Sequence, residues 1–164
     1  MTAKVYHVLF VCTHNSARSI LAEGLLNSLG RGRFVAHSAG SHPEGRVHPM
    51  ALKTLERLHV PTDGFRSKDW AEFAQPGAPA LDFAFTVCDK AAGEVCPVWP
   101  GQPMTAHWGV ADPAAFDGSA EEQAQRFWDT AVILKRRLEL MLALPLASLD
   151  RIAIQREIKD IGTR

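Results

Sequence analysis

The sequence predicts an α/β fold with three layers, α/β/α, around a four-stranded parallel sheet. Short apolar runs of strand length alternate along the chain with segments that have a helical period, and turn-forming residues separate them. Such alternation is typical of parallel strands joined by right-handed helical crossovers. With the usual strand order 2-1-3-4, the third strand lies beside the first.

Four segments are expected to form the strands because each is mostly apolar, as strands buried on both faces are. They are residues 4–11, 34–39, 81–88 and 104–110. Five segments are expected to be helical, namely residues 18–29, 49–58, 67–73, 120–142 and 147–159. The first of these helices ends at Gly30, the second opens with Pro49, and the last follows a break at Pro145.

The length and composition indicate one globular domain. The chain has 164 residues, of which 46% are hydrophobic and 22% charged, and its 18 basic and 18 acidic side chains cancel. We therefore expect a single catalytic domain over residues 1–164, with residues 145–164 as a C-terminal helical extension. Zero net charge argues against a nucleic-acid partner, and no apolar run is long enough to predict a membrane span. The N-terminus leads almost directly into a strand, which leaves no room for a signal peptide and predicts a cytoplasmic protein.

The three cysteines favour catalytic or redox use. Cys12, Cys88 and Cys96 are an odd number in a chain with no predicted export signal, so a structural disulfide framework is improbable. A zinc site also fits poorly, because the chain has neither a Cys-x-x-Cys motif nor a nearby histidine pair.

The segment that follows the first predicted strand has the pattern of an oxyanion trap. Cys12 ends the strand and Arg18 opens the next helix six residues later. Backbone N–H groups, the helix N-terminus and the guanidinium can converge there on a tetrahedral anion, and the same field is expected to lower the pKa of Cys12. Ser19 is expected to donate to the Cys12 sulfur, and Asn15 to brace the loop. The predicted anion-binding residues are Thr13, His14, Asn15, Ser16, Ala17, Arg18 and Ser19.

A carboxylic acid is predicted on the opposite side of this site. Asp112 follows the fourth predicted strand, and Pro113 stiffens the loop that carries it. Such an acid can protonate a departing oxygen. The alternative is an ordinary Asp-Pro turn.

The other two cysteines predict a thiol relay. Cys88 ends the strand beside the first one and therefore opens into the same crevice as Cys12. Cys96 lies within a stretch rich in proline and glycine, whose mobility would allow disulfide exchange with Cys88. For either cysteine alone, a buried core position is the alternative.

These residues match a known family pattern. The chain resembles the thioredoxin-coupled arsenate reductases, which share the low-molecular-weight protein tyrosine phosphatase fold. The matching stretches are residues 11–19, 22–24, 37–40, 86–88, 96–97 and 107–113. The Cys-x5-Arg loop marks the superfamily, whereas the cysteine pair together with His-Trp-Gly-x-x-Asp-Pro is more specific to the reductases.

The resemblance implies a role for each site residue. Cys12 attacks arsenate, Arg18 and the loop amides bind it, and Asp112 assists loss of hydroxide. Cys88 then attacks the Cys12 adduct, and Cys96 accepts the resulting disulfide, which thioredoxin or a glutaredoxin-type protein reduces. No cofactor is implied, although some relatives bind a potassium ion at positions that match Asn15, Glu23, Ser38, Ser67 and Asp69.

The chain departs from the family pattern at three points. Ala17 stands where some reductases have a further cysteine, and His14 replaces the expected glycine. Seven residues separate Cys88 from Cys96, slightly more than the resemblance predicts.

Two alternative functions stay open at this point. A low-molecular-weight tyrosine phosphatase would use Cys12, Arg18 and Asp112 in the same way, but Ala114, Ala115 and Phe116 stand where such phosphatases have tyrosines. A non-enzymatic anion sensor would need neither the acid nor the relay. Phosphate and sulfate are expected to bind as arsenate analogues, and the protein is expected to be a monomer or a weak homodimer.

Overall fold

The computed structural model describes residues 4–89, 99 and 101–164. Its elements, in chain order, are β1 (Tyr6–Cys12), α1 (Arg18–Leu29), β2 (Phe34–Gly40), α2 (Pro49–Arg57), η1 (Trp70–Ala74), β3 (Phe83–Thr86), β4 (Met104–His107), η2 (Pro113–Ala115), α4 (Ala120–Leu142), η3 (Leu146–Ser148) and α5 (Arg151–Ile161). The η elements are short 3-10 helices.

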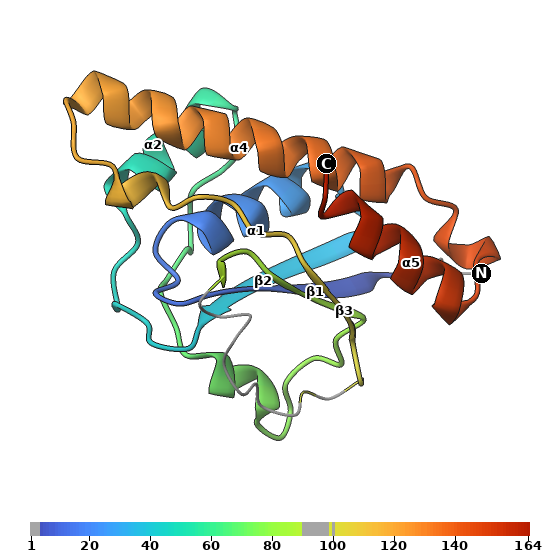
Figure 1. Ribbon diagram of the computed structural model, residues 1–164. Coiled ribbons are helices and arrows are strands. Elements are labelled where there is room, and N and C mark those ends of the chain that lie inside the picture. The colour runs from blue at the N-terminus through green and yellow to red at the C-terminus, as the bar shows by residue number, and fades with distance from the viewer. Residues whose placement is uncertain (1–3, 90–98, 100) are drawn as a thin grey trace.

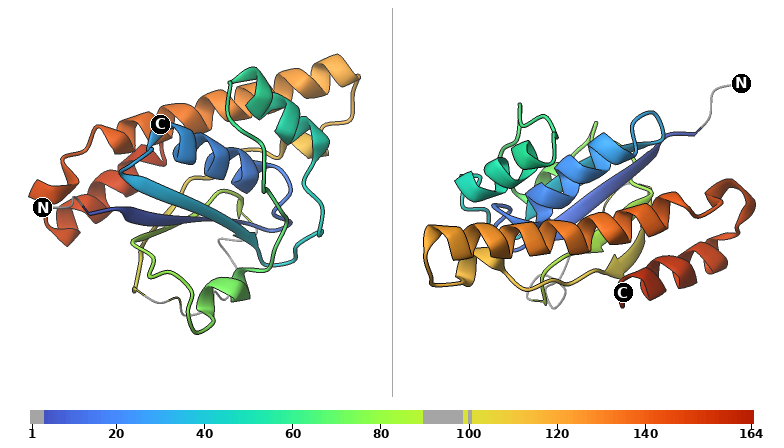
Figure 2. Two further views of the ribbon diagram at one scale, coloured as in Figure 1. Left: turned by 180° about the vertical axis from the view of Figure 1, so that it is seen from behind. Right: turned by 90° about the horizontal axis from the view of Figure 1, so that it is seen from above.

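The four strands form one parallel sheet in the order β2-β1-β3-β4, which confirms the predicted topology. Helices α1, α2, α4 and α5 lie on one side of the sheet, and η1 lies on the other (Figure 1). Seen from above, α4 lies beside α1 and passes over the strands, with α5 beside its C-terminal half (Figure 2).

An aromatic cluster fills the space between the sheet and its helices. The ring centroids of Phe10 and Phe85, from β1 and β3, are 5.7 Å apart, and Trp108 stacks on Phe85 at 4.1 Å. All three side chains are fully buried. Each therefore contributes roughly 1.5–3 kcal/mol through removal from water. This rigid centre lies directly beneath the segment that follows β4.

Parallel pairing brings the ends of the strands together at one edge. Val11 of β1 is in register with Thr86 of β3 on one side, and Cys12 is in register with Gly40 of β2 on the other. The segments that leave β1 and β3 therefore start next to each other. In open parallel sheets this edge is where ligands bind.

The two longest helices begin and end where the sequence predicts. Helix α4 starts with a capping box, in which Ser119 and Glu122 bond each other's backbone N–H groups. Helix α1 ends at Gly30, whose N–H donates to the carbonyl of Leu26. No helix of the described residues is long and apolar enough to cross a membrane.

Strands β3 and β4 are shorter than the sequence predicts. The prediction of a strand over residues 81–88 is wrong at both ends, because ladder pairing is confined to Phe83–Thr86. The prediction of a strand up to residue 110 is also wrong, since β4 ends at His107. The next two carbonyls, of Trp108 and Gly109, accept hydrogen bonds from a side chain of α4 instead of a strand.

Two predicted helices start later than expected. The segment over residues 67–73 is a 3-10 helix that begins at Trp70, because Asp69 pairs with Gly40 in an extended bridge and then caps the turn. The final helix begins at Arg151, where Asp150 caps it, because residues 146–148 after Pro145 form the separate 3-10 turn η3. Strand β1 begins two residues later than predicted, and α5 ends two residues later; β1, β2 and α2 each end within one residue of the predicted position.

Candidate active site

The loop between β1 and α1 is the centre of the site. Cys12 is the last residue of β1, and Arg18 is the first residue of α1. Within the part of the chain that the structure describes, no side chain caps the N-terminus of α1. The N–H groups of its first turn are therefore left for an anion, as the sequence predicts.

Asn15 holds the loop in shape from inside the protein. Its φ of 49° is left-handed, a conformation that asparagine tolerates better than most residues. Its side-chain nitrogen donates to the hydroxyls of Ser19 (2.7 Å) and Ser38 (3.0 Å), and its oxygen accepts from the Lys68 amide (2.9 Å). This is the brace expected of Asn15. In the described residues the Ser19 hydroxyl contacts Asn15 and not the Cys12 sulfur, contrary to the expectation for Ser19.

Arg18 points across the loop towards the segment after β4. One terminal nitrogen donates to the carbonyl of Val110 (3.1 Å), and the other lies 3.7 Å from a carboxylate oxygen of Asp112. The Nε atom is buried and has no hydrogen-bond partner among the described residues. A buried donor without a partner is costly, which indicates a place for an anion oxygen beside Arg18.

Asp112 is positioned to face this guanidinium. One of its oxygens accepts from the N–H of Ala114 (2.9 Å) and so caps η2, while the other oxygen lies toward Arg18. The capping bond fixes the carboxyl group at the side of the cavity opposite the loop.

The two described cysteines, Cys12 and Cys88, contact each other beneath the loop. Cys12 and Cys88 are both buried, and the hydroxyl oxygen of Thr13 lies 3.3 Å from the Cys88 sulfur. The structure therefore brings Cys88 to the loop, as strand order predicts. Cys96 lies outside the described residues.

The electrostatics of Cys12 differ from the expectation. The contact with Cys88 and the burial of the sulfur raise the pKa of Cys12. The charge of Arg18 and the backbone N–H of His14 lower it, but by less. The expectation of a depressed Cys12 pKa is wrong in this structure, because a hydrogen bond from the Cys12 thiol to the Cys88 sulfur and the buried setting both favour the neutral form.

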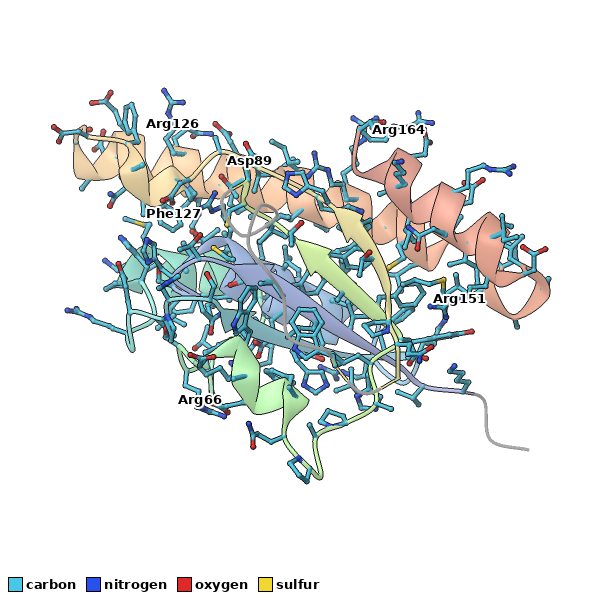
Figure 3. All side chains as sticks on the ribbon, turned by 60° about the horizontal axis from the view of Figure 1, so that its bottom comes forward. Arg66, Asp89, Arg126, Phe127, Arg151 and Arg164 are labelled. Carbon is cyan, nitrogen blue, oxygen red and sulfur yellow. The ribbon has the colours of Figure 1, made fainter. Side chains whose placement is uncertain are left out.

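A cavity of about 480 Å³ opens above these groups. Besides the residues already described, His14 and Asp89 line it, and the backbone around Gly109 forms one wall. Asp89, labelled in Figure 3, follows Cys88 directly and lies 2.7 Å from the His107 ring, whose other nitrogen contacts Thr86 at 2.7 Å. The sequence did not lead us to predict Asp89 as a site residue. Its position directly after Cys88 could have indicated that it lines the cavity.

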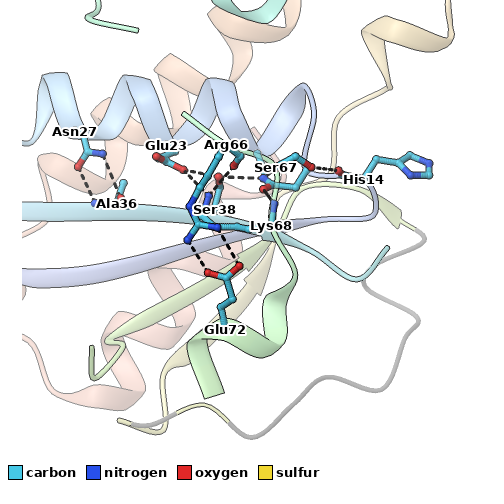
Figure 4. Close-up of polar contacts among 11 residues, drawn as sticks. His14, Glu23, Asn27, Ala36, Ser38, Arg66, Ser67, Lys68 and Glu72 are labelled. Carbon is cyan, nitrogen blue, oxygen red and sulfur yellow. Dashed lines mark hydrogen bonds and ion pairs between the residues drawn. The ribbon is translucent and has the colours of Figure 1, made fainter. Parts of the chain in front are cut away.

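The residues predicted for a potassium ion do not form one site. Ser38 donates to Glu23 and accepts from Asn15, so these three side chains form one network (Figure 4). Ser67 instead donates to the carbonyl of His14, and Asp69 caps η1.

A side-chain cation of the protein itself lies at this network. The ammonium of Lys68 is 3.8 Å from Glu23 and donates to the carbonyl of Arg66. Burial raises the pKa of Glu23, and the charge of Lys68 opposes that shift. The donor set therefore does not fit the predicted ion, because two of its members point elsewhere and Lys68 already neutralises the buried carboxylate. Within the described part of the chain, no group of three or more acidic, histidine or cysteine side chains could hold a metal ion.

The comparison with known families agrees with this geometry. A family model described as low molecular weight phosphotyrosine protein phosphatase matches residues 7–153. The chain belongs to this family. The resemblance to this superfamily that the sequence predicts is thereby confirmed.

Individual members of the low molecular weight phosphatase family carry the comparison further. The arsenate reductase of Halalkalibacterium halodurans is 33% identical over 116 residues, covering 71% of this chain and 80% of that protein. The glutaredoxin arsenate reductase of Synechocystis sp. is 31% identical over 136 residues, covering 83% of this chain and 95% of that protein. A solved arsenate reductase in a phosphate-binding state superposes with a TM-score of 0.67 at 26% identity, covering 85% of this chain and 98% of the other.

Proposed function

We propose that this protein reduces arsenate to arsenite by a thiol relay. In the first step the bound arsenate takes the thiol proton of Cys12, the sulfur attacks arsenic, an As–O bond breaks, and the hydroxide leaves as water with a proton from Asp112. Arg18 and the loop amides hold the remaining oxygens. The Arg18 Nε, buried and unpartnered in the described structure, supports the presence of an anion at this place.

The second step transfers the electrons. The Cys88 sulfur attacks the Cys12 sulfur and its proton passes to the departing arsenite, an S–S bond forms, and the S–As bond breaks with its electron pair on arsenic. As(V) becomes As(III) and leaves as arsenite. The two thiols supply both electrons and end as the Cys12–Cys88 disulfide.

One observation favours reduction over simple hydrolysis. Cys88 is buried in contact with Cys12 and also contacts Thr13, the next residue of the loop. A hydrolase needs water at this position, and a second thiol has no part in that reaction. A thiol that contacts the nucleophile is what electron transfer to its adduct requires.

We further propose that Cys96 closes the relay. Its sulfur attacks Cys88 in the disulfide, releases the Cys12 thiolate and forms Cys88–Cys96. An external dithiol protein of the thioredoxin or glutaredoxin type then reduces this bond and is itself oxidised. Such proteins are kept reduced in the cytoplasm, which is where we place the reaction. No potassium ion is needed, because Lys68 neutralises Glu23.

A second activity, hydrolysis of phosphate monoesters, is supported by the pairing of Arg18 with Asp112. Phosphate and arsenate have the same shape and charge, so Cys12 can form a phosphoenzyme that water resolves. We propose this as a weak side reaction.

The decisive experiment compares single cysteine variants in two assays. Arsenate-dependent NADPH oxidation is measured with thioredoxin and thioredoxin reductase, and separately with glutaredoxin, glutathione and glutathione reductase. Hydrolysis of p-nitrophenyl phosphate is measured alongside. Cys12→Ser should abolish both activities, whereas Cys88→Ser and Cys96→Ser should abolish arsenate turnover and retain the phosphatase activity. Arsenate turnover that survives Cys88→Ser would overturn the relay.

A further inference from the structure

A buried arginine of α4 holds the segment that leads from β4 to the acid. Arg137 donates from one terminal nitrogen to the carbonyls of Trp108 (2.9 Å) and Gly109 (3.2 Å). Its Nε donates to the carbonyl of Arg164 (3.2 Å). The residue is 7% exposed although it carries a charge.

The partners of Arg137 are unusual for a buried cation. Among the described residues it forms no ion pair with an aspartate or glutamate side chain, and burial alone lowers its pKa. A buried charge is a poor source of stability, and apolar residues of similar volume often do as well or better. Three directed bonds to backbone carbonyls have another consequence, because they fix the geometry of the chain that they hold.

That chain continues directly into the active site. Val110, the next residue after Gly109, accepts a hydrogen bond from Arg18, and Asp112 follows two residues later. The backbone at Gly109 is tightly packed, since a Cβ there would lie 2.6 Å from the His107 ring and 3.0 Å from Asp89. We expect a shift of the carbonyls held by Arg137 to move Asp112, because only two residues separate Gly109 from Asp112.

The C-terminal segment completes the same cluster. The indole N–H of Trp108 donates to the carbonyl of Ile158 in α5 (2.9 Å). Gly162 packs so closely that a Cβ there would lie 2.4 Å from the carbonyl of His107. Arg164 lies just beyond the end of α5, close to α4 (Figure 3). The family model matches only as far as residue 153, so these contacts come from a part of the chain beyond it.

We propose that Arg137 is a positioning residue for the reaction, which, together with the C-terminal segment, sets the position of the Asp112 carboxyl opposite Arg18. This inference rests on the proposed function, in which Asp112 is the proton donor. Arg137 itself does not line the active-site cavity. It acts only through the backbone of residues 108–112.

A double-mutant cycle tests this coupling. The four proteins are the unmodified chain, Arg137→Met, Asp112→Asn and the double variant, and kcat/KM for arsenate is measured in the reductase assay. If p-nitrophenyl phosphate is the only substrate turned over, it replaces arsenate. Arg137→Met should lower kcat/KM at least about tenfold in the unmodified chain and less than about twofold when Asp112→Asn is already present.

Further readouts separate positioning from general damage. The inhibition constant of inorganic phosphate depends on anion binding by the loop and Arg18. It should therefore change by less than about twofold in Arg137→Met. Arg136→Met, at the exposed neighbouring position, is the matched control and should match the unmodified chain. Arg137→Lys should recover part of the loss, because it restores a cation that can donate to the same carbonyls.

The outcomes distinguish the two levels of the proposal. Additive losses in the cycle overturn the role of Arg137 and leave the acid role of Asp112 intact. An Asp112→Asn variant with full activity overturns the acid assignment and this inference with it. If Arg137→Met does not fold, a chain ending at Ile161 lacks the Arg164 carbonyl but keeps the apolar face of α5. This shortened chain should show a smaller loss of kcat/KM that is again non-additive with Asp112→Asn. Shortening also removes the exposed ion pair between Arg164 and Asp160, and Asp160→Asn is the control for that loss. A shortened chain with unchanged kcat/KM overturns the role of the C-terminal segment.

Discussion

The hydroxyl oxygen of Thr13 lies 3.3 Å from the sulfur of Cys88. The residue after the nucleophile in the sequence thus contacts a thiol from a different strand. This contact joins the anion-binding loop to the end of β3, and it places Cys88 where it also affects the acidity of Cys12. The Cys12–Cys88 disulfide of the proposed relay, for which arsenate is the oxidant, therefore joins two side chains that already contact each other.

Replacing Cys88 with alanine should make Cys12 more acidic. The largest cause of the raised Cys12 pKa is its contact with Cys88, and its removal leaves Arg18 and the His14 N–H to favour the thiolate. We expect alkylation of Cys12 by iodoacetamide at pH 7 to be several-fold faster in Cys88→Ala. Both proteins carry Cys96→Ser, and mass spectrometry locates the modified residue. A midpoint of the pH profile that stays the same or rises would contradict this account.

Replacing Gly40 with alanine should disturb the catalytic loop. A Cβ at Gly40 would lie 2.6 Å from the carbonyl oxygen of Thr13 and 3.0 Å from the backbone N of Asn15. These are backbone atoms, so the loop itself must move. We expect about 1–3 kcal/mol of lost stability and a loss of at least about tenfold in kcat/KM.

The matched control for this substitution is Gly24→Ala. A Cβ at Gly24 meets only the side chains of Leu55 and Phe65, at 2.9–3.1 Å. Urea unfolding should show a loss of stability there as well, but activity per folded molecule should stay within about twofold. Equal activity losses in the two variants would mean that the effect at Gly40 is not specific to the loop.

The parts of the fold that sequence predicts are those fixed by local signals. Helix α4 starts at a capping box and keeps an apolar period up to Met141, so both its ends are encoded nearby. Cys12 and Arg18 are likewise six residues apart between an apolar strand and a helix. Local periodicity and spacing suffice in such cases.

The remaining features depend on contacts between distant segments. Lys68 is 53 residues from Asn15, and Arg137 is 29 residues from Trp108, so no local pattern pairs them. Even so, Arg137 carries a signal. It lies three residues after Leu134 and four before Met141, on the apolar face of α4, where a charged side chain is unexpected.

Potassium should have no specific effect on the unmodified protein. Lys68 places an ammonium 3.8 Å from Glu23, where a bound cation would serve the same purpose. We expect equal kcat/KM in potassium and sodium chloride at the same ionic strength. In Lys68→Ala the affinity for phosphate should fall several-fold, because the Glu23–Ser38–Asn15 network loses its counter-charge. Lys53→Ala, at an exposed position, controls for the lost charge. Stimulation of the unmodified chain by potassium would refute this role of Lys68.

A histidine on the opposite face of the sheet should make stability depend on pH. His37 stacks on His7 with 3.0 Å between facing ring nitrogens, and Phe73 packs against it. Burial, together with the charges of His7 and Lys68, lowers the pKa of His37 to about 4 from an ordinary value of 6.5. As pH falls, the unfolded chain therefore binds a proton at this residue before the folded protein does. The stability contributed by neutral His37 is complete above about pH 6.5 and is lost as pH falls towards 4.

Urea unfolding between pH 7.5 and about pH 4.5 measures this loss. We expect the unmodified chain to lose about 1–2 kcal/mol more than His37→Gln over that range, a value reduced from the full shift because the ring is partly exposed. His59→Asn, at an exposed histidine, should keep the slope of the unmodified chain. Glutamine cannot bind the proton that unfolded histidine takes up, so His37→Gln should remove this part of the pH dependence. If the free energy of unfolding falls with pH equally in His37→Gln and the unmodified chain, His37 does not supply the dependence.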